Sequence, residues 1–153
     1  MRPPPRKLVH EQSIIAALRA HRRDATVSRE AFHNRPFAEQ LAVAASTTVL
    51  VAPHGAGMVN AAFMPDCSVV IEAYPCGLMI PFYGHLAWNS GKMYLPVHPA
   101  ACWGASVGNA QHQHGHGPWN NSGAVTCTDR TACRYKVRNT PVLLRADESV
   151  ALL

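Results

Sequence analysis

Charged residues and long apolar runs are both scarce in this chain. Charged residues make up 15% of the 153 residues and hydrophobic ones 48%, a balance that excludes wholesale disorder. No apolar run reaches the roughly 18 residues that indicate a transmembrane helix. The Pro-rich, basic start has no apolar segment behind it, so we expect neither a signal peptide nor a membrane anchor in this chain.

The cysteines show no C-x-x-C spacing, which disfavours a zinc ribbon and a thioredoxin-type motif. They lie at Cys67, Cys76, Cys102, Cys127 and Cys133. Their odd number leaves at least one thiol without a partner in the chain. Two interpretations stay open, buried free thiols and a disulfide, such as one that closes the short loop between Cys127 and Cys133.

Negative charge is also limited. Lys and Arg number 14 and Asp and Glu 9, which gives a net charge of +5 at pH 7. This surplus suits an anionic ligand, but it is too small and scattered to indicate a nucleic-acid partner. His112, His114 and His116 alternate in a Gly- and His-rich stretch, which we interpret as a polar loop and not as a metal site.

Short apolar segments alternate with helical patterns over residues 7–100. Expected strands are 7–9, 25–28, 47–52, 68–73 and 93–97, and expected helices are 11–21, 36–45, 58–64 and 81–89. Asn34 is a candidate N-cap, with Pro36 in the first helical turn. The β-branched run 47–52 is typical of a strand buried on both faces of a parallel sheet. The alternation predicts an α/β fold with a Rossmann-like parallel sheet.

The same pattern divides the chain into four parts. We expect an extended, basic, Pro-rich tail at 1–6 and a Rossmann-like lobe at 7–100. A Gly- and His-rich loop or insertion follows at 101–126, and a return segment with a short strand near 140–144 occupies 127–153.

A glycine turn after a buried strand is the candidate functional site. The turn His54-Gly55-Ala56-Gly57 joins the strand to a helix, and its glycines let backbone N–H groups approach a ligand. The helix N-terminus adds unpaired N–H donors, so a phosphate is the natural guest. Glu72 ends the next strand, from which a carboxylate can accept hydrogen bonds from ribose hydroxyls.

Three other interpretations of these motifs compete with that one. The turn can be a tight strand-to-helix connection that binds nothing. A dinucleotide-binding protein of the NAD type is disfavoured because Asn60 stands where the third glycine of the fingerprint belongs. An esterase is disfavoured because no His follows the candidate acid Asp129, although the segment around Ser106 matches G-x-S-x-G.

Several stretches together resemble glycosyltransferase family 61. They are Arg6 to Leu18, the F-x-E-Q run Phe37 to Gln40, the stretch Val49 to Pro65 with its H-G-A-G turn and F-M-P end, and the V-V-I-E run Val69 to Glu72. The motifs are specific in combination. The resemblance covers residues 6–98 and is loose beyond them.

The resemblance implies an inverting glycosyltransferase of GT-B type, whose C-terminal, donor-binding Rossmann-like lobe this chain is similar to. It implies that a nucleotide sugar, which we expect to be a UDP-sugar, is the donor and that a glycan or glycoprotein hydroxyl is the acceptor. The donor-binding residues it implies are His54, Gly55, Ala56, Gly57, Asn60 and Glu72. The H-G-A-G turn would face the diphosphate and Glu72 the nucleoside.

The resemblance assigns no catalytic residue, no cofactor besides the donor and no metal, and it implies the secretory pathway, in the Golgi or ER lumen. The chain has no room for the second lobe of such an enzyme. We therefore expect a fragment that needs the missing N-terminal lobe or a partner subunit. The alternative is a catalytically inactive nucleotide-binding lobe that depends on a partner.

Overall fold

The computed structural model describes residues 8–75, 78, 80–98 and 142–143. The elements are β1 (Leu8–Val9), α1 (Glu11–His21), α2 (Phe37–Ala45), β2 (Val49–Pro53), the 3-10 helix η1 (Ala56–Phe63), β3 (Val69–Ala73), α3 (Phe82–Asn89), β4 (Met93–Val97) and β5 (Val142–Leu143). The predicted α/β class is confirmed, because β2, β3 and β4 form a three-stranded parallel sheet in chain order. The two-residue strands β1 and β5 also pair in parallel.

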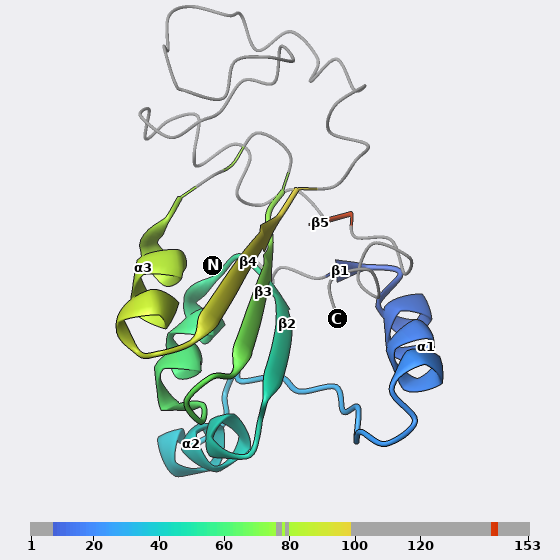
Figure 1. Cartoon of the computed structure of the whole chain (residues 1–153), viewed down its shortest axis with the longest axis horizontal. Helices are drawn as coiled ribbons and strands as arrows, with labels where there is room; N and C mark the ends of the chain where they lie inside the picture. Colours follow the sequence, from blue (N-terminus) through green and yellow to red (C-terminus); the bar gives the residue numbers. More distant parts are fainter. Residues whose placement is uncertain (1–7, 76–77, 79, 99–141, 144–153) are drawn as a thin grey trace, which may run out of the picture.

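The sheet lies between two layers of helices. Figure 1 places α1 on one side of the sheet and α2 and α3 on the other. On the first side, Ile14 and Leu18 of α1 cluster with Ala73 of β3, and Val51 and Val97 pack against them. Burial of these apolar side chains is what holds α1 on the sheet.

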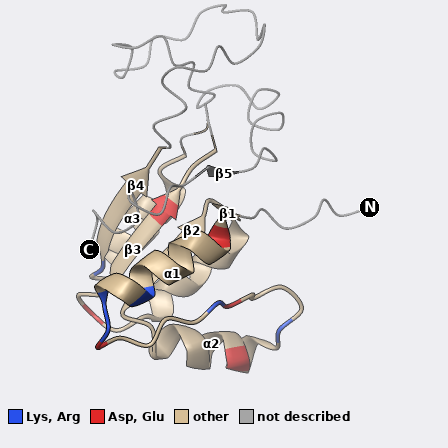
Figure 2. Cartoon of the chain, turned by 90° about the vertical axis from the view of Figure 1, so that its right-hand side faces the viewer, with Lys and Arg blue, Asp and Glu red and all other residues tan. Residues whose placement is uncertain are grey.

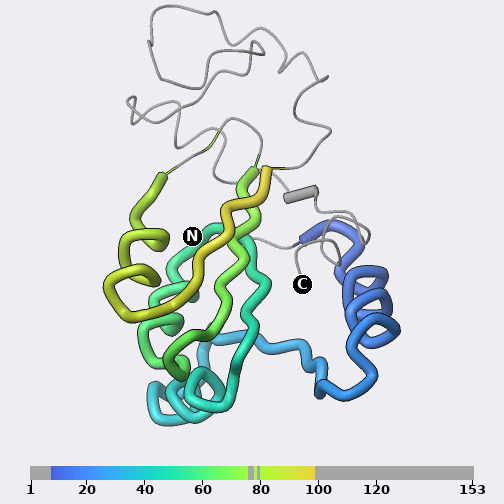
Figure 3. Tube along the Cα trace, viewed as in Figure 1, coloured from blue at the N-terminus to red at the C-terminus, as the bar shows by residue number. Residues whose placement is uncertain are grey.

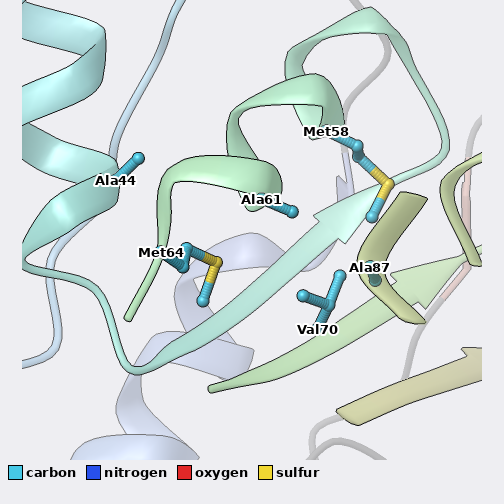
Figure 4. Close-up of a cluster of buried hydrophobic side chains, with 6 residues drawn as sticks. All are labelled: Ala44, Met58, Ala61, Met64, Val70 and Ala87. Carbon is cyan, nitrogen blue, oxygen red and sulfur yellow. The ribbon is translucent and has the colours of Figure 1, made fainter. Parts of the chain in front are cut away.

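The second face of the sheet carries the larger core. Met58 and Ala61 of η1, and Met64 directly after it, cluster with Val70 of β3 and Ala87 of α3 (Figure 4). Ala44 of α2 completes this cluster. The turn that precedes η1 is therefore attached to a helix whose inner side is fixed in the core.

The three strands end at the same level. In the register, Pro53 lies opposite Ala73, and Ala73 lies opposite Val97. The residues that follow the strands meet at one edge as a result, and ligands of open α/β sheets bind at this carboxyl edge. The next residues His54, Tyr74 and His98 thus lie in neighbouring positions.

The predicted strand at 25–28 is wrong. Residues 22–36 form an irregular segment that carries the chain from α1 to α2 across to the other face of the sheet (Figure 3). Side chains hold it in place: Arg19 donates to the carbonyl of Val27 at 2.8 Å, and Arg29 pairs with Glu11 at 2.8 Å. The β-branched residues of this segment were the only indication of a strand. In the structure the segment instead connects helices on opposite faces of the sheet.

The predicted start of α2 also needs correction. Asn34 is no N-cap but adopts a left-handed conformation with φ of 59°, and Pro36 occupies the cap position without a side-chain hydrogen bond. Among the apolar residues of α2, Ala44 is buried, whereas Phe37 is 61% exposed. Phe37 packs edge-on against Phe63 of η1 at 5.7 Å between ring centroids.

Burial on both faces, expected for 47–52, belongs to β3 and not to β2. Val70 and Ile71 of β3 have no exposed surface. β2 is an edge strand of its sheet within the described residues, and its first residue, Val49, is exposed. The two segments have a similar apolar composition. They differ in burial because β3 is the central strand of this sheet and β2 lies at its edge.

Surface charges form ion pairs. Figure 2 shows both signs of charge on α1 and on the segment leading to α2. Besides the pair of Arg29 with Glu11, Arg35 pairs with Glu30 at 2.9 Å and Arg22 with Asp24 at 3.0 Å. Each of these acids therefore has an arginine partner at the surface.

Candidate functional site: the carboxyl edge of the sheet

The H-G-A-G turn begins where β2 ends and opens onto solvent at its far end. Gly55 is half-buried and Ala56 and Gly57, the first residues of η1, are exposed. The amide of Met58 already donates to the carbonyl of Gly55 at 3.0 Å. The amides before it are the unpaired donors of a helix N-terminus.

Backbone conformation does not explain the two glycines. Gly55 has φ of 171°, an extended geometry open to any residue, and Gly57 is not in the left-handed region. A Cβ on Gly57 would meet its nearest neighbour, Phe32, at 3.5 Å, an ordinary contact. What the absent side chains provide is open space in front of the backbone N–H groups.

His54 and Glu72 form a buried pair on neighbouring strands. His54 is 7% exposed and Glu72 has no exposed surface. The Nδ1 atom of His54 lies 2.5 Å from Oε1 of Glu72. The two residues that the sequence placed at successive strand ends are therefore in direct contact, and the carboxylate faces the imidazole and not the solvent.

Two phenols complete the surroundings of the carboxylate. Tyr94 donates to Oε2 of Glu72, and the Tyr74 hydroxyl lies 3.0 Å from that oxygen and 2.7 Å from the carbonyl of Ile80. Burial raises the pKa of both Tyr74 and Tyr94 well above the usual value. Both phenols are therefore protonated at neutral pH.

Three aromatic rings stack along the carboxyl edge. Tyr74 lies 5.1 Å from His54 at an interplanar angle of 21°, and 5.1 Å from His98 at 12°. Backbone bonds extend the strand ladder beneath them, from the amide of His54 to Ala73 at 2.8 Å and from that of Tyr74 to Val97 at 2.9 Å. Burial lowers the pKa of His98, which favours its neutral ring.

Asn60 supports the turn from within. It is 2% exposed, and its Nδ2 atom donates to the carbonyl of Gly57 and to Oε1 of Gln40, each at 3.1 Å. Gln40 in turn donates to the carbonyl of Arg35 at 2.8 Å. The F-x-E-Q run and the H-G-A-G turn are thus joined by one buried side chain, which explains why the two motifs occur together.

All six residues expected at the donor site lie around this edge, but sequence reasoning missed three others. Tyr74, Tyr94 and His98 were not expected to take part. For Tyr74 and His98 the signal was available, because each directly follows a strand. Tyr94 points into the site from inside β4, and only the tertiary structure brings it to Glu72.

Other sequence candidates lie elsewhere. Ser106 and the alternating histidines fall outside the described residues, and no group of three metal-ligating side chains occurs in the part that is described. Tyr83 lies 5.4 Å from the His54 ring, whereas Trp88 is 77% exposed.

The cysteine alternatives are settled for one position. Cys67 is a free thiol and is exposed, so burial does not apply to it. The remaining cysteines lie outside the described residues.

Comparison with known proteins shows which family part of this chain resembles. Residues 2–71 match the model of the family described as Glycosyltransferase 61. Over this segment the chain is similar to glycosyltransferase family 61. The predicted resemblance is therefore confirmed there, and the segment contains the F-x-E-Q run and the whole H-G-A-G turn.

One known protein that is similar to this chain is named for its activity. Over 71 residues the chain is 32% identical to the EGF domain-specific O-linked N-acetylglucosamine transferase of Drosophila melanogaster. The alignment covers 46% of this chain and only 14% of that relative's length. No helix among the described residues has the length and apolar character to cross a membrane.

Proposed function

We propose that this chain is the donor-binding part of an inverting GT-B glycosyltransferase, and that it binds a UDP-sugar with the diphosphate at the H-G-A-G turn. The observation that carries the proposal is the open turn itself. Gly55 is not required by backbone conformation, and Gly57 is required neither by conformation nor by crowding, so access of a ligand to the backbone N–H groups explains them.

The chemistry of the edge suits a diphosphate. The start of η1 offers backbone donors and a partial positive charge, and His54 lies immediately before it. Such donors stabilise the negative charge that develops on the departing nucleoside diphosphate. Asn60 holds the turn in this shape from its buried side.

The transfer follows from that arrangement. A hydroxyl of a glycan or protein attacks the anomeric carbon of the donor as the bond to the diphosphate oxygen breaks. The acceptor proton passes to a base, which we place in a second lobe or partner subunit. The relative's name supports N-acetylglucosamine as the sugar, an EGF domain as the acceptor class and the secretory pathway as the location.

A panel of ligands tests the proposal by thermal shift. UDP and UDP-N-acetylglucosamine are expected to raise the melting temperature of the chain, because a ligand that binds the native state stabilises it. NAD and buffer alone are the controls. Stabilisation by NAD instead, or by none of the nucleotides, would contradict the proposal.

A nucleotide-binding lobe without activity of its own is the second candidate. The chain matches 14% of the length of that relative, so transfer by this chain is tested separately from binding. Radiolabelled sugar transfer, assayed alongside binding, separates the two: binding with transfer supports the enzyme, and binding without transfer supports the partner-dependent lobe.

A further inference from the structure

We propose that Glu72 is a positioning residue: it accepts the Nδ1 proton of His54 and orients the ring so that Nε2, when it also carries a proton, donates to the diphosphate. The inference rests on the proposed function for the identity of the ligand. It assigns Glu72 an indirect role, through His54, in place of the contact with ribose expected from its strand position.

Burial of the carboxylate argues for this role. Glu72 has no exposed surface, and a buried charge is costly unless hydrogen bonds compensate for it. Its Oε2 atom receives the bond from Tyr94 and lies 3.0 Å from the Tyr74 hydroxyl. Oε1 is left for His54 alone among the described residues, at 2.5 Å.

The proton positions follow from the donors. Because both tyrosines keep their protons, Tyr94 acts as a donor to Glu72, and the carboxylate acts as an acceptor. In this arrangement the carboxylate is the acceptor, and Nδ1 of His54 supplies the proton of the short contact with Oε1. The bond at Nδ1 orients the ring, and Nε2–H of the doubly protonated ring is the donor offered to an anionic ligand.

The ring is also held on its faces. Tyr74 stacks on it at 5.1 Å, and Tyr83 of α3 approaches at a tilted 5.4 Å. The backbone amide of His54 is tied to Ala73 at 2.8 Å. A ring constrained at its edge, its face and its backbone has one orientation, which preorganised binding of a phosphate requires.

Side chains from two elements and from the residue after β3 lie around the His54 ring. Glu72 reaches it from β3, Tyr74 follows the same strand, and Tyr83 comes from α3. Tyr94 of β4 acts on it through Glu72. No other charged group is placed against the ring by the described part of the chain.

Nitrogen-15 NMR of the full chain tests the inference without a ligand. A long-range proton–nitrogen spectrum at pH 8 reports which ring nitrogen of each histidine bears hydrogen, and His54→Gln assigns the signals. We expect Nδ1 of His54 to be protonated, with its proton far downfield. In Glu72→Gln that downfield resonance is lost, because a neutral amide either accepts more weakly or turns its NH₂ toward Nδ1.

Asp66→Asn is the matched control, since Asp66 is an exposed carboxylate that pairs with Lys92 and not with His54. It should leave the His54 signals unchanged. A wild-type His54 without a proton on Nδ1, or a Glu72→Gln spectrum identical to the wild-type one, would overturn the inference. The wild-type spectrum decides the question even where Glu72→Gln does not fold.

The ligand arm separates this inference from the proposed function. UDP is expected to bind Glu72→Gln about tenfold more weakly than the wild type, the loss typical of one hydrogen bond to a charged group. Wild-type affinity in Glu72→Gln would contradict the positioning role. Absence of UDP binding by the wild type would contradict the proposed function alone, because the NMR result stands without it.

Discussion

At the scale of single residues, the site depends on the contrast between an open backbone and a closed set of side chains. Gly57 is exposed, while Glu72 at the same edge is fully buried. Both were assigned to the donor from the sequence. The structure separates their tasks, because an exposed N–H can touch a ligand and a buried carboxylate acts through a neighbour.

Gly57→Asp tests the exposed part of the site. A carboxylate there opposes the diphosphate, and two like charges at about 4 Å cost ~1–4 kcal/mol, so UDP should bind at least about fivefold more weakly. Isothermal titration with UDP measures the change. Gly57→Ala is the control, because its Cβ fits at 3.5 Å from Phe32. Equal affinity of the Asp and Ala variants would remove the turn from the phosphate site.

At the scale of elements, the connections decide how the edge is built. α3 ends in a Schellman motif, in which the amide of Lys92 donates to Ala87 and that of Gly91 to Trp88. Gly91 adopts φ of 73° and turns the chain directly into β4. This reversal sets the position of β4, and with it the position of Tyr94 opposite Glu72.

Gly91→Ala tests that connection. A Cβ in the left-handed region costs ~1–2 kcal/mol, and the nearest neighbour, Asp66, leaves room at 3.5 Å, so conformation alone sets the penalty. The free energy of unfolding, measured in urea, should fall by about 1 kcal/mol. Gly91→Asn should lose less, because Asn tolerates this conformation. Equal losses for Ala and Asn would argue against the assignment.

At the scale of the whole molecule, stability is expected to depend on pH through the buried phenols. The pKa values of Tyr74 and Tyr94 are raised by burial in the folded chain and return to about 10 on unfolding. Above pH 10 the unfolded chain releases protons that the folded chain retains. The stabilisation is complete below pH 10 and is lost as the pH rises above it.

Tyr94→Phe tests this dependence. The free energy of unfolding of the wild type should decrease with pH above about 10, and the slope should be shallower in the variant, which lacks one of the two titrating groups. Denaturant titrations between pH 8 and pH 11 measure the slope. The variant also loses the hydrogen bond of Tyr94 to Glu72, which lowers its free energy of unfolding by a constant amount. This constant does not affect the slope with pH, so the slopes are compared. Parallel curves for both proteins would contradict the assignment.

Local patterns gave the elements wherever a segment's own residues decide its conformation. The bounds of α1 and β4 were predicted to the residue, since an apolar helix face and a short run of mostly apolar residues are local signals. The segment 25–28 was mistaken for a strand, and β2 for a fully buried one. Those errors concern which segments become neighbours, and a single sequence does not encode that locally.

The glycine turn, its place after a strand and its family motifs could all be recognised in the amino-acid order, because spacing along the chain survives folding unchanged. Only the tertiary structure revealed three contacts of the site. They are the contact of Glu72 with His54, the hydrogen bond from Tyr94 on a neighbouring strand to Glu72, and the hydrogen bond from Asn60 to Gly57. They depend on strand register and on the approach of α2 to η1, and packing of the complete core sets both.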